Sequence, residues 1–202
     1  RVSMHPGQYT VLNSLDELVA ERAARDLNYH ARFLDSLGLG PEHKMVLHLG
    51  GAYGDKERAK ERFVSRYKLL DPAVKKRLVL ENDDRLFNIE DVLHTANKVG
   101  MPAVYDNLHN AVNPVDASCK DVEWIERCRE TWTNEDGSQK VHYSQQNPDK
   151  RSGAHSESIR IDEFLDFHRE VSGVGTDIML EVKDKNLSAL KCINCVSNRG
   201  IK

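Results

Sequence analysis

The sequence has few cysteines, no long apolar run and no signal peptide, and each of these absences excludes a class of protein. Four cysteines in 202 residues are too few for a disulfide framework and are typical of a reducing compartment. No segment approaches the roughly 18 uninterrupted apolar residues of a membrane span, and the N-terminal residues lack the basic and apolar pattern of a signal peptide. We therefore expect a soluble, cytoplasmic domain with no membrane partner.

The sequence also lacks the second cysteine pair of a structural zinc site and the excess of basic residues usual in nucleic-acid enzymes. Cys192 and Cys195 form a CxxC, but the second pair that a structural zinc site needs is missing, so we interpret them as ordinary cysteines. The net charge of -3 lacks the basic excess that is usual in nucleic-acid enzymes. Bound metal ions would change that balance locally, so the charge does not exclude DNA as a partner.

What is present is an alternation of strand and helix patterns. Six short segments rich in Val, Leu, Ile or Met indicate buried strands. Segments with helical spacing separate them, and such alternation predicts a parallel sheet. The strand segments are 2–5, 44–51, 77–83, 101–109, 140–146 and 177–185, and the helical segments are 15–37, 55–69, 88–99, 121–131 and 162–171.

This α/β alternation favours a TIM (β/α)₈ barrel, because the strand starts recur at close to the roughly 30 residues per unit of that fold. Residues 1–185 would supply six β/α units, and residues 186–202 would form a C-terminal tail. The first residue is Arg1, at the head of a strand pattern, so we expect this chain to lack the first two units. The alternative is a doubly wound nucleotide-binding sheet, but the expected GxGxxG is missing.

The longest helical segment, residues 15–37, carries its own start signal. Ser14 and Glu17 match a capping box ahead of the apolar run. The side expected to face the core consists of Leu15, Leu18, Val19, Ala23, Leu27, Ala31, Leu34 and Leu37.

Each predicted strand ends in a potential metal ligand or proton carrier. In a barrel these positions share the C-terminal rim, where active sites of this fold lie. One such residue alone is usually an ordinary core or surface side chain, but three carboxylates and three imidazoles together would repel or desolvate one another unless cations held them. The pattern predicts a multinuclear metal site formed by His5, His48, Glu81, Asp106, His142 and Glu181.

Three further residues extend this cluster. His109 follows Asp106 by three residues, and His155 lies in a GAH sequence after the fifth strand segment. Lys140 precedes His142 by two residues, so both side chains face the same side of the sheet. An ammonium group beside divalent cations is unfavourable, so Lys140 is either kept in solvent or carbamylated by CO₂ into an anionic ligand. Mixed imidazole and carboxylate ligands suit zinc or manganese.

Six blocks of the sequence, in the same order, closely resemble the UV damage endonucleases. They cover nearly the whole chain and read SMHPGQY, VLHLGGAYG, LENDDRLFN, DNLHNAVNP, KVHYSQQNPDKRSGAH and LEVKDK. The resemblance implies a TIM-barrel nuclease related to endonuclease IV, with up to three divalent metal ions, commonly Mn²⁺, at the barrel mouth. It also implies excision repair of double-stranded DNA through a nick immediately 5′ to UV photoproducts, and in some members at abasic sites.

The functional residues of this family can be carried over to the matching positions. Lys140 falls on a lysine that is carboxylated in the family, and the residues implied in catalysis are Glu81, Lys140 and His155. Gln8 and Tyr9 match a pair that probes the distorted duplex. The metal-centre positions correspond to His5, His48, Glu81, Asp106, His109, Lys140, His142, His155 and Glu181.

Basic residues divide between the two ends of the predicted barrel. Lys56, Arg58, Lys150 and Arg151 lie in loops that follow strands, so we expect them to contact DNA phosphates. The basic run 75–77 precedes a strand and belongs to the opposite face, where we expect a solvated cluster.

The predicted activity is metal-dependent hydrolysis of the phosphodiester backbone by a monomer, leaving 3′-OH and 5′-phosphate ends. We expect Glu81 to bridge two ions, with His5 and His48 at the first, Asp106, His155 and Glu181 at the second, and His109, Lys140 and His142 at the third. The runner-up is a metal-dependent sugar isomerase or epimerase, which shares the barrel but uses fewer metals and a closed pocket. The other alternative is a non-catalytic remnant that binds damaged DNA.

Overall fold

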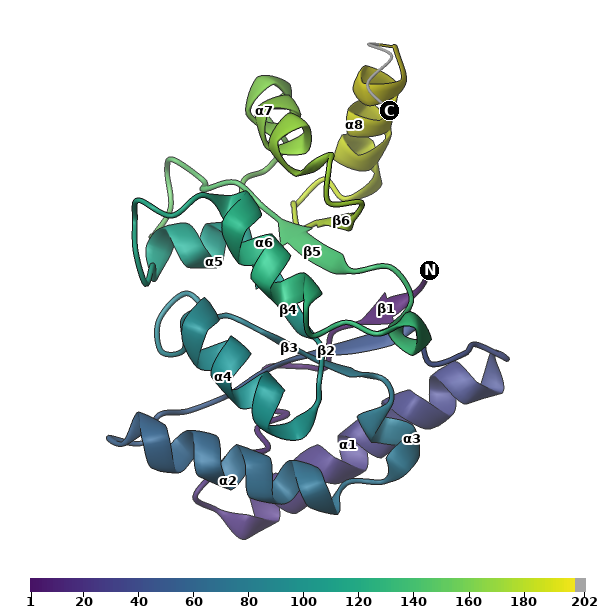
Figure 1. The fold of residues 1–202 in the computed structure, drawn as a ribbon, viewed down its shortest axis with the longest axis vertical. Coiled ribbons are helices and arrows are strands. Elements are labelled where there is room, and N and C mark those ends of the chain that lie inside the picture. Colours follow the sequence, from purple (N-terminus) through teal and green to yellow (C-terminus); the bar gives the residue numbers. More distant parts are fainter. Residues whose placement is uncertain (199–202) are drawn as a thin grey trace.

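The computed structural model describes residues 1–198 and shows six parallel strands in one sheet, with helices packed against it (Figure 1). The strands lie side by side in chain order and form a half-barrel, as successive units of a TIM-barrel-like fold do. Each predicted strand segment contains a strand, and the predicted parallel sheet is confirmed. The strands are β1 (Ser3–Met4), β2 (Lys44–His48), β3 (Leu78–Glu81), β4 (Ala103–Asp106), β5 (Lys140–Tyr143) and β6 (Asp177–Leu180).

The helices follow the strands and contact one another in turn around the sheet, α2 with α4, α4 with α6, α6 with α7 and α7 with α8. In Figure 1, α1 and α2 lie at the bottom of the molecule and α7 and α8 at the top. None of the helices in the described part of the chain combines the length and hydropathy of a bilayer span. The helices are α1 (Glu17–Ser36), α2 (Lys56–Leu69), α3 (Pro72–Lys75), α4 (Ile89–Val99), α5 (Asn107–Val112), α6 (Asp121–Arg129), α7 (Ile161–Val171) and α8 (Asn186–Asn198), with a 3₁₀ turn at Asn134–Asp136.

The segment interpreted as a C-terminal tail, residues 186–202, begins with helix α8. Cys192 on this helix is buried against the core, and Cys195 is half-buried. Residues 199–202 of the segment lie outside the described residues. The apolar face of α8 packs against α7, so at least its first part belongs to the folded domain.

Side chains of β2, β3 and β4 alternate between two apolar clusters. The larger cluster lies against the helices and takes residues such as Leu47 of β2 and Leu80 of β3. The smaller cluster, on the other face of the sheet, consists of Val46, Val79 and Val104. Because strand side chains repeat every second residue, the next inward positions toward the C-terminal rim are those of His48, Glu81 and Asp106. A layer of valines thus forms the floor beneath the strand-end ligands.

Helix α1 differs from its prediction at both ends. It begins at Glu17, and its N-cap is Asp16, whose side chain accepts a hydrogen bond from Leu18 N at 2.8 Å. The predicted capping box at Ser14 is therefore wrong. Three positions predicted to face the core are also exposed, because the buried ones are confined to the middle turns between Ala20 and Leu34. The exposed residues are Leu15, Leu18 and Leu37.

The expectation of a solvated basic cluster at 75–77 is wrong for Arg77, which is 4% exposed. Its guanidinium donates to Gly40 O at 2.5 Å and to Leu39 O at 2.6 Å, and it pairs with Asp35 Oδ1 at 2.5 Å. A fixed fork of donors suits a group of carbonyl and carboxylate oxygens. Arg77 therefore holds the loop after α1 against the start of β3 rather than facing solvent.

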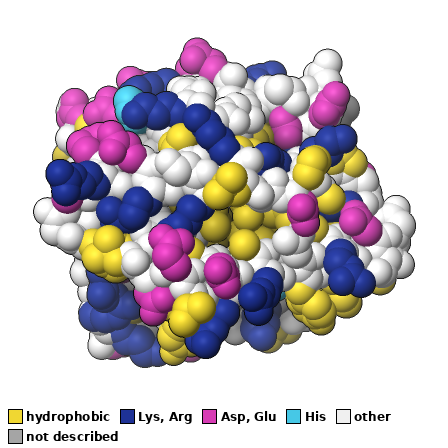
Figure 2. Space-filling model, turned by 90° about the horizontal axis from the view of Figure 1, so that it is seen from below, with side chains coloured by type: hydrophobic (Ala, Val, Ile, Leu, Met, Phe, Trp, Pro, Cys, Tyr) yellow, Lys and Arg dark blue, Asp and Glu magenta, His cyan; other side chains and the backbone are white. Residues whose placement is uncertain are grey.

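The face at the bottom of Figure 1, where α1 and α2 lie, is seen directly in Figure 2. Positive and negative side chains are mixed over it, with apolar side chains gathered near its centre (Figure 2). Exposed apolar residues of α1 are Leu18, Tyr29 and Phe33. Because both signs of charge alternate there, this face does not present the continuous basic surface that favours binding to a DNA backbone.

Candidate metal centre

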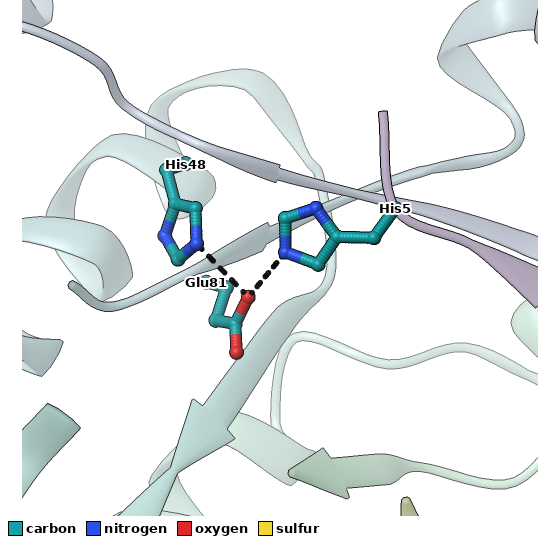
Figure 3. A group of neighbouring side chains, drawn as sticks. All are labelled: His5, His48 and Glu81. Atoms are coloured by element: carbon teal, nitrogen blue, oxygen red, sulfur yellow. Dashed lines mark hydrogen bonds and ion pairs between the residues drawn. The ribbon is translucent and has the colours of Figure 1, made fainter. Parts of the chain in front are cut away.

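The ends of the first three strands bring two imidazoles and a carboxylate together (Figure 3). Glu81 is fully buried, and its Oε2 atom lies 3.1 Å from His5 Nε2 and 3.4 Å from His48 Nε2. The parallel register aligns His48 of β2 with Glu81 of β3, so the two side chains reach the same edge of the sheet. These three residues form a group whose ligand atoms all lie within 4.8 Å of one another.

The other oxygen of Glu81 faces the far half of the sheet. His142 Nδ1, at the end of β5, lies 2.6 Å from Glu81 Oε1 and 2.9 Å from Glu181 Oε1. Glu81, His142 and Glu181 are a second group with metal-ligand spacing, and Glu81, Asp106 and His109 are a third. Glu81 therefore belongs to all three groups.

Asp106 and His109 are held by Asn82, a residue that the sequence reasoning did not single out. The Asn82 side chain accepts a hydrogen bond from Asp106 N at 2.8 Å and donates to Asp106 O at 3.0 Å. Its backbone carbonyl lies 2.9 Å from His109 Nδ1. The feature of the sequence that could have identified Asn82 was its position directly after Glu81. A residue that follows a strand-end ligand can form hydrogen bonds to the neighbouring strand.

His155 lies beside the three groups rather than within one. Its Nε2 is 3.7 Å from Glu181 Oε2, and its ring centroid is 6.4 Å from that of His109. An isolated bridge to Gln146 positions the loop that carries it. The structure therefore pairs Asp106 with His109 and His142 with Glu181, whereas the sequence-based division placed Asp106 with Glu181 and His109 with His142.

Lys140 is 3% exposed, so the interpretation that it stays in solvent is wrong. Within residues 1–198 its Nζ has no hydrogen-bond partner. Burial, together with the positive charges of Arg1 and Lys44, lowers the pKa of Lys140 to about 8. A buried amine without a partner is unfavourable when charged. Lys140 therefore sits beneath His142 on β5 as an unsatisfied group.

The ionisable side chains of the cluster shift one another's pKa values. Burial alone would raise the pKa of Glu81, but His142 and His48 lower it well below its ordinary value. Burial opposes protonation of His142, yet Glu81 and Glu181 raise its pKa well above the usual range. Burial raises the pKa of Asp106 to about 7. An imidazolium at His142 would thus offset the charges of Glu81 and Glu181, as cations would, whereas burial lowers the pKa values of His48 and His155.

Whether metal ions fit this site can be judged from polar atoms left unsatisfied. In the part of the chain that the structure describes, several buried ligand-type atoms lack a hydrogen-bond partner. They are His48 Nδ1, Asp106 Oδ2 and His142 Nε2. Buried polar atoms are normally satisfied, so these unpartnered nitrogen and oxygen atoms fit the ligands of divalent ions such as Mn²⁺ or Zn²⁺.

The predicted lesion-probing residues follow His5 in the chain. Gln8 and Tyr9 are both exposed in the loop after β1, and Tyr9 is 83% exposed. Gln8 lines a cleft of 630 Å³ whose walls also include His5, His48 and His109. The structure therefore places at least Gln8 at the opening through which a ligand would reach the candidate metal ligands.

The four predicted phosphate-contacting residues each have a carboxylate partner. Arg151 Nη1 lies 3.4 Å from Asp84, which lines the same cleft. Lys150 pairs with Glu157 at 2.7 Å, Lys56 with Asp91 at 3.3 Å and Arg58 with Asp55 at 3.4 Å. These pairs involve partly exposed groups, which exchange partners at little cost. Arg151 is the member of this set placed beside the cleft.

A parallel half-barrel with histidines and carboxylates converging at the carboxyl ends of its strands defines a TIM-barrel-like protein with a candidate multinuclear metal centre. Comparison with known proteins gives the particular family. The profile of the family described as UV-endonuclease UvdE matches residues 1–202. A curated relative, the UV DNA damage endonuclease of Clostridium perfringens, is 49% identical over 195 residues, covering 96% of this chain. The chain belongs to the UV-endonuclease UvdE family.

Solved structures agree with this assignment. The crystal structure of SacUVDE is 38% identical and superposes with a TM-score of 0.91 over 99% of this chain and 66% of that one. A D-psicose 3-epimerase from Clostridium cellulolyticum H10 shares the fold alone, with 13% identity and a TM-score of 0.58, over 90% of this chain and 63% of that one. The chain spans 47% of the length of the Clostridium perfringens relative.

Proposed function

We propose that the protein carrying this chain is a DNA repair endonuclease that hydrolyses the phosphodiester backbone 5′ to UV photoproducts and at abasic sites, leaving 3′-OH and 5′-phosphate ends. The observation that carries the proposal is the position of Glu81, a fully buried carboxylate shared by three groups of metal-ligand spacing. Membership of the UvdE family supports DNA as the substrate.

The ligand set supports up to three divalent ions, with Mn²⁺ favoured by the carboxylates and Zn²⁺ as the second choice. Such ions would supply charge neutralisation at the phosphodiester and activation of water. The chain would hold them through the three groups that meet at Glu81, with His155 reaching the site beside Glu181. Glu81, Lys140 and His155 are the residues to which we assign roles in catalysis.

Lys140 is proposed to act as a carbamate. The ammonium first loses one proton to give the neutral amine. Addition of this amine to CO₂ forms one N–C bond, opens one C=O π bond and releases a second proton, so that a buried cation becomes an anionic carbamate. The unpartnered Nζ and its 3% exposure support this modification, because an anionic ligand would suit a site that a buried ammonium opposes.

Damaged double-stranded DNA would lie across the rim, with Gln8 and Tyr9 inserted at the lesion. A flat phenol can replace lost base stacking, and an amide can bond to orphaned base edges. Exposure of Tyr9 at 83% supports this role, since an aromatic ring so placed has little packing of its own. Lys56, Arg58, Lys150 and Arg151 are proposed to contact phosphates.

The whole protein is proposed to complete the barrel between β6 and β1. Within the described chain these two strands are the edges of the sheet, and β6 is incompletely buried. Edge strands leave a row of backbone groups unpaired, and closing the sheet into a barrel removes both edges. Two further β/α units would cover them, as in an eight-stranded barrel.

The proposed activity is tested with the full-length protein and a duplex oligonucleotide that carries one pyrimidine dimer. We expect a single nick 5′ to the dimer with Mn²⁺ present and no nick after chelation and dialysis, because the charge neutralisation is then lost. Gel electrophoresis of end-labelled strands gives the position and the end chemistry. An undamaged duplex is the control, and cleavage that continues at the same rate without divalent ions would refute the proposal.

Charge reversal of Arg151 should weaken binding to the damaged duplex and flatten its salt dependence. Losing one phosphate contact lowers the slope of log affinity against log salt by about 1. Fluorescence anisotropy with a labelled duplex over a range of salt concentrations measures both quantities for Arg151→Glu. The matched control is Lys76→Glu, an exposed lysine at the opposite end of the strands. Equal slopes for the two variants would place Arg151 away from the DNA.

A further inference from the structure

The loop after β2 holds a tyrosine in an unusual backbone conformation. Tyr53 has φ 52° and Gly54 has φ 81°, and Asp55 N donates to Ala52 O at 3.0 Å. This is a tight turn with both central residues in the left-handed region, where glycine, asparagine and aspartate are usual and a bulky side chain is disfavoured. Non-glycine residues in this region cluster at functional sites.

Contacts with two neighbouring residues fix the position of the Tyr53 ring. A Cβ added at Gly51 would lie 2.6 Å from Tyr53 Cζ, so the ring lies over the backbone at a place where a methyl group would displace it. Arg62 Cζ lies 5.4 Å from the ring centroid. Cation–π contact of this kind holds an aromatic ring in place. The ring is therefore positioned from two directions although the turn beneath it is strained.

The supports of the ring are themselves fixed by a buried residue. Asn13 is fully buried, donates to Gly51 O at 2.8 Å and accepts from Gly51 N at 3.2 Å. Arg62 Nε donates to Asn13 O at 3.1 Å. The loop after β1 thus clamps both the glycine and the arginine that orient Tyr53.

Tyr53 is nevertheless 45% exposed and lines the 630 Å³ cleft. The same cleft contains Gln8 and the candidate metal ligands His5, His48 and His109, and Leu86 adds an apolar wall. An exposed aromatic ring fixed at the edge of a polar cleft offers a surface on which a flat ligand can pack.

We propose that Tyr53 is a nucleobase-binding residue, which packs against a base of the DNA strand beside the metal centre. This inference rests on the proposed function for the identity of the ligand. An aromatic surface accepts any of the four bases, because every base has a π-face, so Tyr53 would hold the strand without reading its sequence. The strained turn is explained if the cleft requires the ring at this place.

The test uses the full-length protein and two measurements on a duplex with one abasic-site analogue. Tyr53→Asn removes the ring but keeps a residue that tolerates the left-handed turn. We expect this variant to raise the Kd and KM at least about fivefold, with kcat within twofold, because base–aromatic stacking acts in binding. Tyr53→Phe should behave as the wild type, and Gly51→Ala, whose new methyl would displace the ring, should match Tyr53→Asn.

Binding is measured by anisotropy in the presence of chelator, so that it does not depend on cleavage, and 2-aminopurine placed beside the analogue reports stacking. If the wild-type protein binds this duplex but does not nick it when Mn²⁺ is present, the proposed cleavage at abasic sites is refuted and this inference stands. Unchanged Kd and 2-aminopurine fluorescence in Tyr53→Asn would overturn the inference, as would an equal loss in Tyr29→Ala, an exposed tyrosine of α1. A fall in the Tm of Tyr53→Asn with unchanged Kd would assign Tyr53 a structural role and would also overturn it.

Discussion

Replacing Glu81 by glutamine is expected to reduce nicking of a dimer-containing duplex by about 1,000-fold or more, equivalent to roughly 4 kcal/mol of transition-state stabilisation. The carboxylate is fully buried and has one oxygen near His5 and His48 and the other near His142. The amide has nearly the same shape but carries no charge, so all three candidate groups lose their shared anion at once.

The measurements are single-turnover cleavage and the metal content of the purified variant, both in the full-length protein. We expect Glu81→Gln to retain less than half of the bound divalent ions, because neutral amides are poorer ligands than carboxylates. Glu21→Gln, an exposed carboxylate of α1, is the matched control. Wild-type metal content and cleavage in Glu81→Gln would show that this carboxylate does not organise the site.

Replacing Lys140 by methionine is expected to lower nicking by about a hundredfold while raising the stability of the metal-free protein. Activity should fall because the variant cannot form the anionic carbamate. The free energy of unfolding should rise by about 1–3 kcal/mol, since methionine fills the site without a buried, unpartnered amine. The opposite signs of the two effects separate a role in the site from a role in folding.

Cleavage assays and urea denaturation in the presence of chelator measure the two effects. Wild-type protein kept free of CO₂ should also lose activity and regain it with bicarbonate, whereas Lys140→Met should not respond. Lys76→Met, an exposed lysine, serves as the control for both assays. A destabilised but fully active Lys140→Met would contradict the proposed modification.

The sequence predicted the parallel sheet and the membership of the strand-end cluster for a simple physical reason. Buried parallel strands read as continuous apolar runs, and their carboxyl ends share one edge. A histidine or carboxylate that follows each run must therefore reach that edge. His48 and Glu81 meet at 3.4 Å because the register aligns the residues in which their strands end.

Grouping within the cluster was not predictable in the same way, and here the tertiary structure decided. His142 lies near Glu181 because β5 pairs with β6 in parallel, and Asn82 ties His109 to Asp106. Side-chain reach across a curved sheet depends on backbone positions fixed by packing elsewhere in the domain.

Burial was the other property that the sequence left open. Lys140 and Arg77 are polar residues whose surroundings come from segments distant in the chain. Local patterns determine which residues face one side of a strand, because the backbone repeats every two residues. They do not determine which residues pack against that side of the strand, because those residues come from other parts of the chain. The sequence by itself thus determined the fold and the residues at the rim, and the tertiary structure decided how those residues are grouped and which of them are enclosed.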